Sequence, residues 1–212
     1  MSSLDQHEQE QVDALKAWWK ENGKWVIGAV AVGVLGFAGV YSWKNHQANQ
    51  AAEAGKLYVE VLKQVATNDA KRISDAADAL VSRYGSSAYA PLAQMSAAQA
   101  NLQAKDIARA KVELQWVVEH AVETAMQDTA RLKLASILLD EKKYDEALKQ
   151  LDAAHPESFT GLYADLRGDV LSAQGKVAEA RAAYQQAYDK TDAKSTYRNL
   201  IQLKLDGLGS AK

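Results

Sequence analysis

WVIGAVAVGVLGFAGVYSW, residues 25–43, is the stretch that decides the fold. Lys24 and Lys44 bound it, and between them there is no charged residue and nothing more polar than Ser42. At 1.5 Å per residue, a helix of this length reaches about 28 Å, close to the roughly 30 Å hydrocarbon core of a bilayer. The stretch therefore predicts one transmembrane helix.

Two alternatives to a membrane span are a secretory signal peptide and the buried helix of a soluble domain. The apolar run is longer than the signal-peptide core of about 7 to 15 residues, and the bulky residues 41–43 occupy the position of a cleavage site. A buried helix would not explain why tryptophans and lysines flank the run on both sides, as interfacial anchors do. We therefore expect four residues to anchor the helix: Lys24, Trp25, Trp43 and Lys44.

Lysines near the span predict its orientation. Three lie shortly before it and two lie within a similar distance after it: Lys16, Lys20, Lys24, Lys44 and Lys56. Since cytoplasmic flanks carry an excess of Lys and Arg, this difference favours an N-terminus in the cytoplasm.

Small residues inside the span give it a surface on which a second helix could pack. Gly28, Gly33 and Gly36 belong to this surface, and glycine allows two helix backbones to approach closely. Because glycine is common in membrane helices generally, the sequence leaves open whether these residues bind a partner helix.

The composition excludes several classes of function. With 25 Lys and Arg against 27 Asp and Glu, the net charge of −2 leaves no basic surplus for nucleic acid. The absence of cysteine excludes thiol catalysis, thiolate metal sites and disulfides. Only two prolines occur in 212 residues, and the abundance of good helix formers predicts an all-α protein.

Hydrophobic periodicity divides the chain into four segments. Residues 1–24 are a short head, in which residues 11–20 have the pattern of an amphipathic helix that lies in the membrane interface or leads into the span. After the span at 25–43, residues 44–90 form a helical connector and a first helical hairpin. Residues 91–212 contain repeated hairpins and a capping helix.

The repeats share a marker: a small residue, a large apolar residue four positions later, and another small or apolar residue three positions after that. It occurs three times, at Ala110–Leu114–Val117, Ala147–Leu151–Ala154 and Ala180–Tyr184–Ala187. The spacings of 37 and 33 residues are close to the 34 of a tetratricopeptide repeat.

Helix packing explains the marker, because two antiparallel helices approach closely only where a small side chain lies at their crossing. Gly168 and Ala180 are the expected close-approach points of the last pair. The first unit departs from this pattern, with Asn101 at the position of Leu171. The hairpin around Ala77, 33 residues before Ala110, is a candidate fourth copy.

A final apolar stripe in DAKSTYRNLIQLKLDGL, residues 192–208, is typical of a terminal helix that covers the last repeat. The predicted fold is therefore all-α. One N-terminal transmembrane helix precedes a tetratricopeptide-like solenoid of helical hairpins, which ends in a C-terminal capping helix.

Four motifs are distinctive: QVDALKAWWKENGK before the span, WKNHQ at its end, LKLASILLDEKKYDEALKQLD from residue 132 and YADLRGDVLSAQGKVAEARAAYQQA from residue 163. In these motifs the sequence resembles the YfgM-type ancillary subunits of the bacterial Sec translocon. The resemblance implies a single-span inner-membrane protein with a cytoplasmic N-terminus and a periplasmic repeat domain. It also implies association with the Sec translocon and with the membrane-anchored periplasmic chaperone PpiD.

No motif in the sequence indicates catalysis, a metal or a cofactor. The four histidines, His7, His46, His120 and His155, fall singly in different segments, without ligand spacing. Asp165 and Asp169 lie four apart like an acid–base pair, but such carboxylates usually belong to a solvated helix surface. We therefore expect a protein that is not an enzyme.

A binding groove is the remaining expectation, since the first helix of each pair lines the groove of such a solenoid. Three positions recur on a helix face that packing within the pair does not require: Met95, Gln99 and Leu102, then Leu132, Ser136 and Leu139, then Asp165, Asp169 and Ser172. They are the predicted partner groove. The alternative is that Leu132 and Leu139 are buried against a neighbouring repeat.

Two functions fit these expectations. The first is a scaffold that joins the Sec translocon, the chaperone PpiD and the membrane, and helps to hand over translocated proteins. The second is a membrane-anchored regulatory scaffold whose head, residues 1–24, sequesters a soluble regulator. The sequence does not decide whether the repeats contact unfolded translocating chains.

Overall fold

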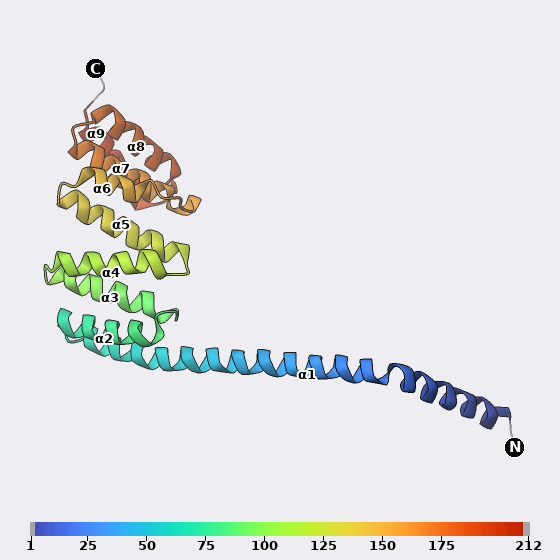
Figure 1. Cartoon of the computed structure of the whole chain (residues 1–212). Coiled ribbons are helices and arrows are strands. Elements are labelled where there is room, and N and C mark those ends of the chain that lie inside the picture. Colours follow the sequence, from blue (N-terminus) through green and yellow to red (C-terminus); the bar gives the residue numbers. More distant parts are fainter. Residues whose placement is uncertain (1–2, 210–212) are drawn as a thin grey trace. The chain divides into compact units, whose positions relative to one another are not determined.

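The computed structural model describes residues 3–209, with side chains from residue 10 onward, and within this range every regular element is a helix (Figure 1). The chain divides into two compact units, Met1–Gln50 and Ala51–Lys212. Helix α1, Ser3–Val65, contributes to both units. The predicted boundaries after residues 24 and 43 fall inside α1 and remain predictions.

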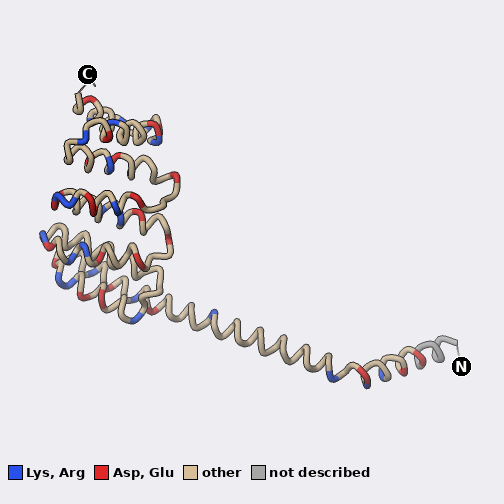
Figure 2. Tube along the Cα trace, turned by 45° about the horizontal axis from the view of Figure 1, so that its top comes forward, with Lys and Arg blue, Asp and Glu red and all other residues tan. Residues whose placement is uncertain are grey.

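The first unit contains the apolar stretch of α1. The helix from Glu10 onward is long and apolar enough to cross a membrane, as the sequence predicts. Figure 2 shows no charged residue between Lys24 and Lys44. The large side chains of this stretch are exposed, with Trp25 at 82%, which would be unfavourable in water and suits a lipid environment.

The second unit is built from antiparallel helices that follow one another along the chain. The end of α1 is followed by α2 (Ala70–Tyr84), α3 (Tyr89–Gln103), α4 (Ile107–His120), α5 (Thr124–Asp140), α6 (Tyr144–Leu151), the short 3₁₀ helix η1 (Glu157–Phe159), α7 (Thr160–Ala173), α8 (Val177–Lys190) and α9 (Thr196–Gly207). This is the predicted tetratricopeptide-like arrangement.

The turn inside each helix pair repeats with the same geometry. The residue directly before the N-cap of the second helix has a left-handed backbone, with φ between +56° and +75°. In the four turns this residue is Asn68, Lys105, Lys142 and Gly175. In the third turn the Lys143 amide donates to the Leu138 carbonyl at 2.8 Å, which satisfies one of the free carbonyls at the helix end. Four matching turns show that the end of α1 and α2 form a complete pair.

The turns also correct one predicted equivalence. The sequence spacing made Ala77 the counterpart of Ala110, but Ala110 lies five residues after its left-handed residue, and the position five after Asn68 is Ile73. Ala77 instead takes the place of Leu114. The first pair is therefore shifted by one helical turn from the predicted register.

Each helix pair buries two residues at equivalent positions, one on each helix. One residue lies seven positions before the left-handed residue and the other nine after it: Val61 with Ala77, Ala98 with Leu114, Ala135 with Leu151, and Gly168 with Tyr184. The two members of each pair belong to one core cluster or, for the last pair, touch directly. A large residue always meets a small one, and the largest, Tyr184, meets glycine.

The crossing at Gly168 leaves no room for a side chain. A Cβ atom there would lie 2.4 Å from the Tyr184 ring, and Ala180 one turn before Tyr184 is fully buried. The predicted close approach of the last helix pair is confirmed.

Replacing Gly168 with Ala should lower the free energy of unfolding by about 1 to 3 kcal/mol, because the added methyl group overpacks the crossing. A second change, Tyr184→Leu, should recover part of this loss, since Leu and Ala share the crossing in the two preceding pairs. Thermal or urea unfolding of the four members of this double-mutant cycle measures the coupling. If the effects of the two changes on the free energy of unfolding simply add, residues 168 and 184 do not compete for the same space.

The left-handed turns generate a second prediction. A non-glycine residue in this backbone region carries a steric cost, so Lys142→Gly should stabilise the protein by about 0.5 to 1 kcal/mol, and Gly175→Ala should destabilise it by about 1 kcal/mol. Unfolding midpoints check both signs. Lys142→Ala is the matched control, because it removes the charge and keeps the Cβ atom; equal effects of Ala and Gly would show that backbone strain is not the cause.

Candidate docking surfaces

The glycines of the span form an open surface in the first unit. A Cβ atom added at Gly28, Gly33 or Gly36 would meet no other atom within 4 Å. The anchors Lys24, Trp25, Trp43 and Lys44 are also exposed. The structure therefore leaves the glycine face free for another helix, and its use in binding stays a prediction.

Four of the six predicted groove residues in the first two units are half-buried. Met95 and Leu102 are half-buried against the cluster that contains Leu134 of α5. Leu132 and Leu139 are half-buried against the cluster that contains Tyr163 of α7. Only Gln99 and Ser136, between these pairs, are exposed.

In the last unit helix α9 covers the same helix face. The Tyr197 hydroxyl donates to Asp165 at 2.5 Å, and the Lys204 ammonium donates to Asp165 and Asp169 at 2.8 Å each. Tyr184 donates to Asp169 at 2.7 Å, and Asp165 is buried. The interpretation of these two aspartates as a solvated surface is therefore wrong, because a helix some 35 residues later lies over them.

Proton binding in this cluster depends on the fold. Burial raises the pKa of the Tyr184 and Tyr197 hydroxyls, and their hydrogen bonds to Asp169 and Asp165 raise it further. Burial lowers the pKa of Lys204, but hydrogen bonds to both carboxylates outweigh this effect, so that the pKa is raised. Each group thus holds its proton more tightly in the folded state than in the unfolded state.

Two further carboxylates are buried, and the sequence did not single them out. Glu113 of α4, 1% exposed, accepts hydrogen bonds from Ser74 of α2, Asn101 of α3 and Arg109, at 2.8 to 3.0 Å. Asn101 is the residue that departed from the repeat pattern. The polar Asn101 at an otherwise apolar repeat position was the sequence feature that could have revealed a buried polar partner. That partner is Glu113.

Asp128 of α5 is the second buried carboxylate. It accepts a hydrogen bond from the Tyr163 hydroxyl at 2.7 Å and one from Arg131 at 3.0 Å. Burial, together with this hydrogen bond, raises the pKa of Tyr163 to about 12. Asp128 therefore connects α5 to the following pair.

The described histidines are isolated from one another. His120 stacks on Trp116 with ring centroids 4.5 Å apart, and His155 lies against Tyr163 at 4.1 Å. His46 is on α1, and His7 lies outside the residues whose side chains are described. Among described residues, no group of three or more His, Asp or Glu is placed to hold a metal ion.

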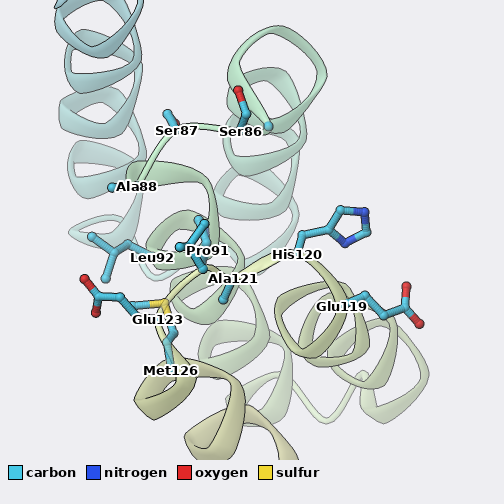
Figure 3. A pocket seen from close by; sticks show the side chains of 12 residues that line it. Ser86, Ser87, Ala88, Pro91, Leu92, Glu119, His120, Ala121, Glu123 and Met126 are labelled. Carbon is cyan, nitrogen blue, oxygen red and sulfur yellow. The ribbon is translucent and has the colours of Figure 1, made fainter. Parts of the chain in front are cut away.

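One apolar depression was not predicted. It has a volume of about 770 Å³ and lies between the α2–α3 loop and the α4–α5 loop (Figure 3). Pro91, Leu92, Ala121 and Met126 lie between the carboxylates of Glu119 and Glu123 in this view. Its lining combines loop residues with the ends of α3, α4 and α5, which come together only in the folded chain, so the periodicity of a single helix could not reveal it.

Comparison with known proteins places the chain in a family. The family described as tetratricopeptide repeat-like domain matches residues 16–210. A protein of Neisseria gonorrhoeae, named ancillary SecYEG translocon subunit, is 34% identical over 203 residues, which cover 95% of this chain and 97% of that protein. The chain belongs to this family. No solved structure matches it.

Other ancillary SecYEG translocon subunits are similar over the same length. The proteins of Escherichia coli and Haemophilus influenzae are 29% and 27% identical, over 96% and 95% of this chain and 97% of each relative. The predicted family and the all-α, tetratricopeptide-like fold are thus confirmed. Membership of this family, together with one N-terminal helix able to cross a membrane, fits an inner-membrane protein.

The cluster under α9 predicts a loss of stability in alkali. The stability that Tyr184, Tyr197 and Lys204 contribute is present below their unfolded pKa values of about 10 and is lost as the pH rises above them. The free energy of unfolding should therefore fall between pH 9 and pH 11. Tyr197→Phe should make this fall shallower, and at pH 8 it should cost about 1.5 to 3 kcal/mol for the lost hydrogen bond to a carboxylate. Urea unfolding at several pH values measures both; an unchanged slope in Tyr197→Phe would exclude its part in the effect.

Proposed function

We propose that this protein is a non-enzymatic ancillary subunit of the SecYEG translocon. The observation that carries the proposal is similarity over 95% of the chain, span and repeats included, to proteins that bear this name. A protein made of one span and helical repeats suits a binding role, because stacked repeats present an extended surface. Within this role, the repeat domain scaffolds the channel and the periplasmic chaperone PpiD and helps to hand over translocated proteins.

The orientation that this role requires has residues 1–24 in the cytoplasm and the repeats in the periplasm. Three lysines shortly before the span against two after it support this orientation. In this arrangement the interfacial anchors hold the span in the bilayer, and the open glycine face meets a helix of the channel.

The proposed groove lies on the first helices of the pairs. Gln99 and Ser136 are exposed there, and the half-buried leucines beside them, Leu102 and Leu139, add apolar surface. In the last pair α9 covers Asp165 and leaves Ser172 half-buried, so the first units offer more of the surface to a partner. Unfolded translocating chains are one candidate partner for this groove.

Co-purification tests the proposal. The full chain, extracted in mild detergent from a strain that produces SecYEG, should recover the channel. Replacing Gly28, Gly33 and Gly36 with Leu should reduce the recovery about tenfold, because the helices can no longer approach closely. Val30→Leu with Val34→Leu is the matched control, since these changes enlarge side chains outside the glycine positions and keep the span apolar.

The outcomes separate the proposals. No recovery of SecYEG by the parent chain would refute the role in the translocon. If the variant with Leu at the three glycine positions recovers SecYEG normally, only the proposed contact between the glycine face and the channel is refuted. Capture of a soluble cytoplasmic protein that depends on residues 1–24, in place of SecYEG, would favour the regulatory scaffold.

A further inference from the structure

The apolar depression of Figure 3 is large enough to receive side chains of another molecule. Its volume of about 770 Å³ lies within the range of small-ligand pockets, roughly 300 to 1,000 Å³. Beside it Val122 is 92% exposed, because the backbone is extended at Ala121 and Glu123 and holds Val122 away from the helices. An apolar side chain this exposed is buried only when another molecule binds over it.

The apolar surface continues along α4. A second depression, of about 590 Å³, lies between α4 and α6 and shares Glu119 with the first. Trp116 lines it, and Val112 at its edge is 62% exposed. The two depressions adjoin at Glu119 and together border α4 from Val112 to Val122; we call this surface the α4 track.

Carboxylates outnumber basic side chains around the α4 track; Lys111, which lines the second depression, is paired with Glu141 at 2.6 Å. Glu119 and Glu123 flank the first depression, and Glu146 flanks the second. Glu119 accepts a hydrogen bond from Gln115 at 2.6 Å, and none of the three carboxylates forms an ion pair with a described residue. Helices α3 and α5 begin at the first depression without a side-chain cap, but their partial positive ends are weaker than full carboxylate charges.

We propose that the α4 track is the docking site for an amphipathic helix of a partner protein, with apolar residues on one side and Lys or Arg beside them. Two adjacent apolar depressions suit the i, i+3, i+4 and i+7 anchors of a helix. The carboxylates select cationic flanks and disfavour an anionic lipid surface. The site is centred on α4, the second helix of its pair, and shares no residue with the predicted groove or with the span, so it does not depend on the proposed role in the translocon.

A peptide of defined sequence tests the site. The probe is a fluorescent 18-residue helix with Leu on one face and Lys on the other, added to the full chain in lipid nanodiscs, with empty nanodiscs as background. Binding should be saturable and should weaken with added salt. A peptide of the same composition in scrambled order, which lacks an apolar face, should bind at least ten times more weakly.

Variants decide whether the peptide uses this surface. Val122→Ser and the double change Glu119→Lys with Glu123→Lys should each weaken binding at least tenfold, while circular dichroism shows an unchanged melting curve. Leu203→Ser on α9 and Glu179→Lys on α8 are matched controls at exposed positions and should bind like the parent. Equal binding by the parent and the track variants, or equal binding of the scrambled peptide, would overturn the proposal. So would self-association of the chain that Val122→Ser abolishes, because the occupant would then be a second copy.

Discussion

The space at the crossing of two helices is the constraint on which the repeat domain depends. Each pair fills it with one large and one small side chain, and either helix can supply the large one: Val61 of α1 meets Ala77, whereas Tyr184 of α8 meets Gly168. The turn must then place the two residues opposite each other, which explains why the left-handed residue recurs at a fixed offset from both. Because interiors are close-packed, a change in one member requires a change in the other. In all four pairs a larger residue is therefore matched by a smaller one, although the residue types differ between pairs.

Buried carboxylates add a second level of organisation, since each accepts a hydrogen bond from at least one other helix. Glu113 joins α4 to α2 and α3, Asp128 joins α5 to α7, and Asp165 joins α7 to α9. Leaving any of these charges without its partners would be costly, because a buried charge needs compensating hydrogen bonds. The hydrogen bonds therefore disfavour alternative alignments between helices whose alanine-rich surfaces look alike. The same reasoning accounts for the position of α9, whose Tyr197 and Lys204 donate hydrogen bonds to the two aspartates of α7.

The sequence predicted the features that depend on local pattern. The span followed from a run without charge, and the hairpins followed from apolar periodicity and the spacing of Ala110, Ala147 and Ala180. The register of the first pair was wrong because its large and small residues are exchanged, which made Ala77 look like a marker. Contacts between distant residues, such as Lys204 with Asp165, carry no local signal. Nor does the exposure of Val122, which depends on the backbone of a three-residue connection. The predicted groove residues were correctly placed on the first helices, but how far the next repeat covers them depends on tertiary packing.

Contacts within the repeat domain join helices that are neighbours or next neighbours along the chain, as the pairs α2–α3, α5–α7 and α8–α9 illustrate. A domain with such contacts resembles a one-dimensional array, in which each unit is held only by those beside it. Opening can then begin at an end and stop at an internal boundary, without melting the remainder. Amide hydrogen exchange would be graded along the array, fastest in α9, which has a neighbour on one side only. A partner that binds two adjacent units would slow amide hydrogen exchange at their shared boundary. The fraction of protein with the partner bound could then be measured from the amide exchange rates alone.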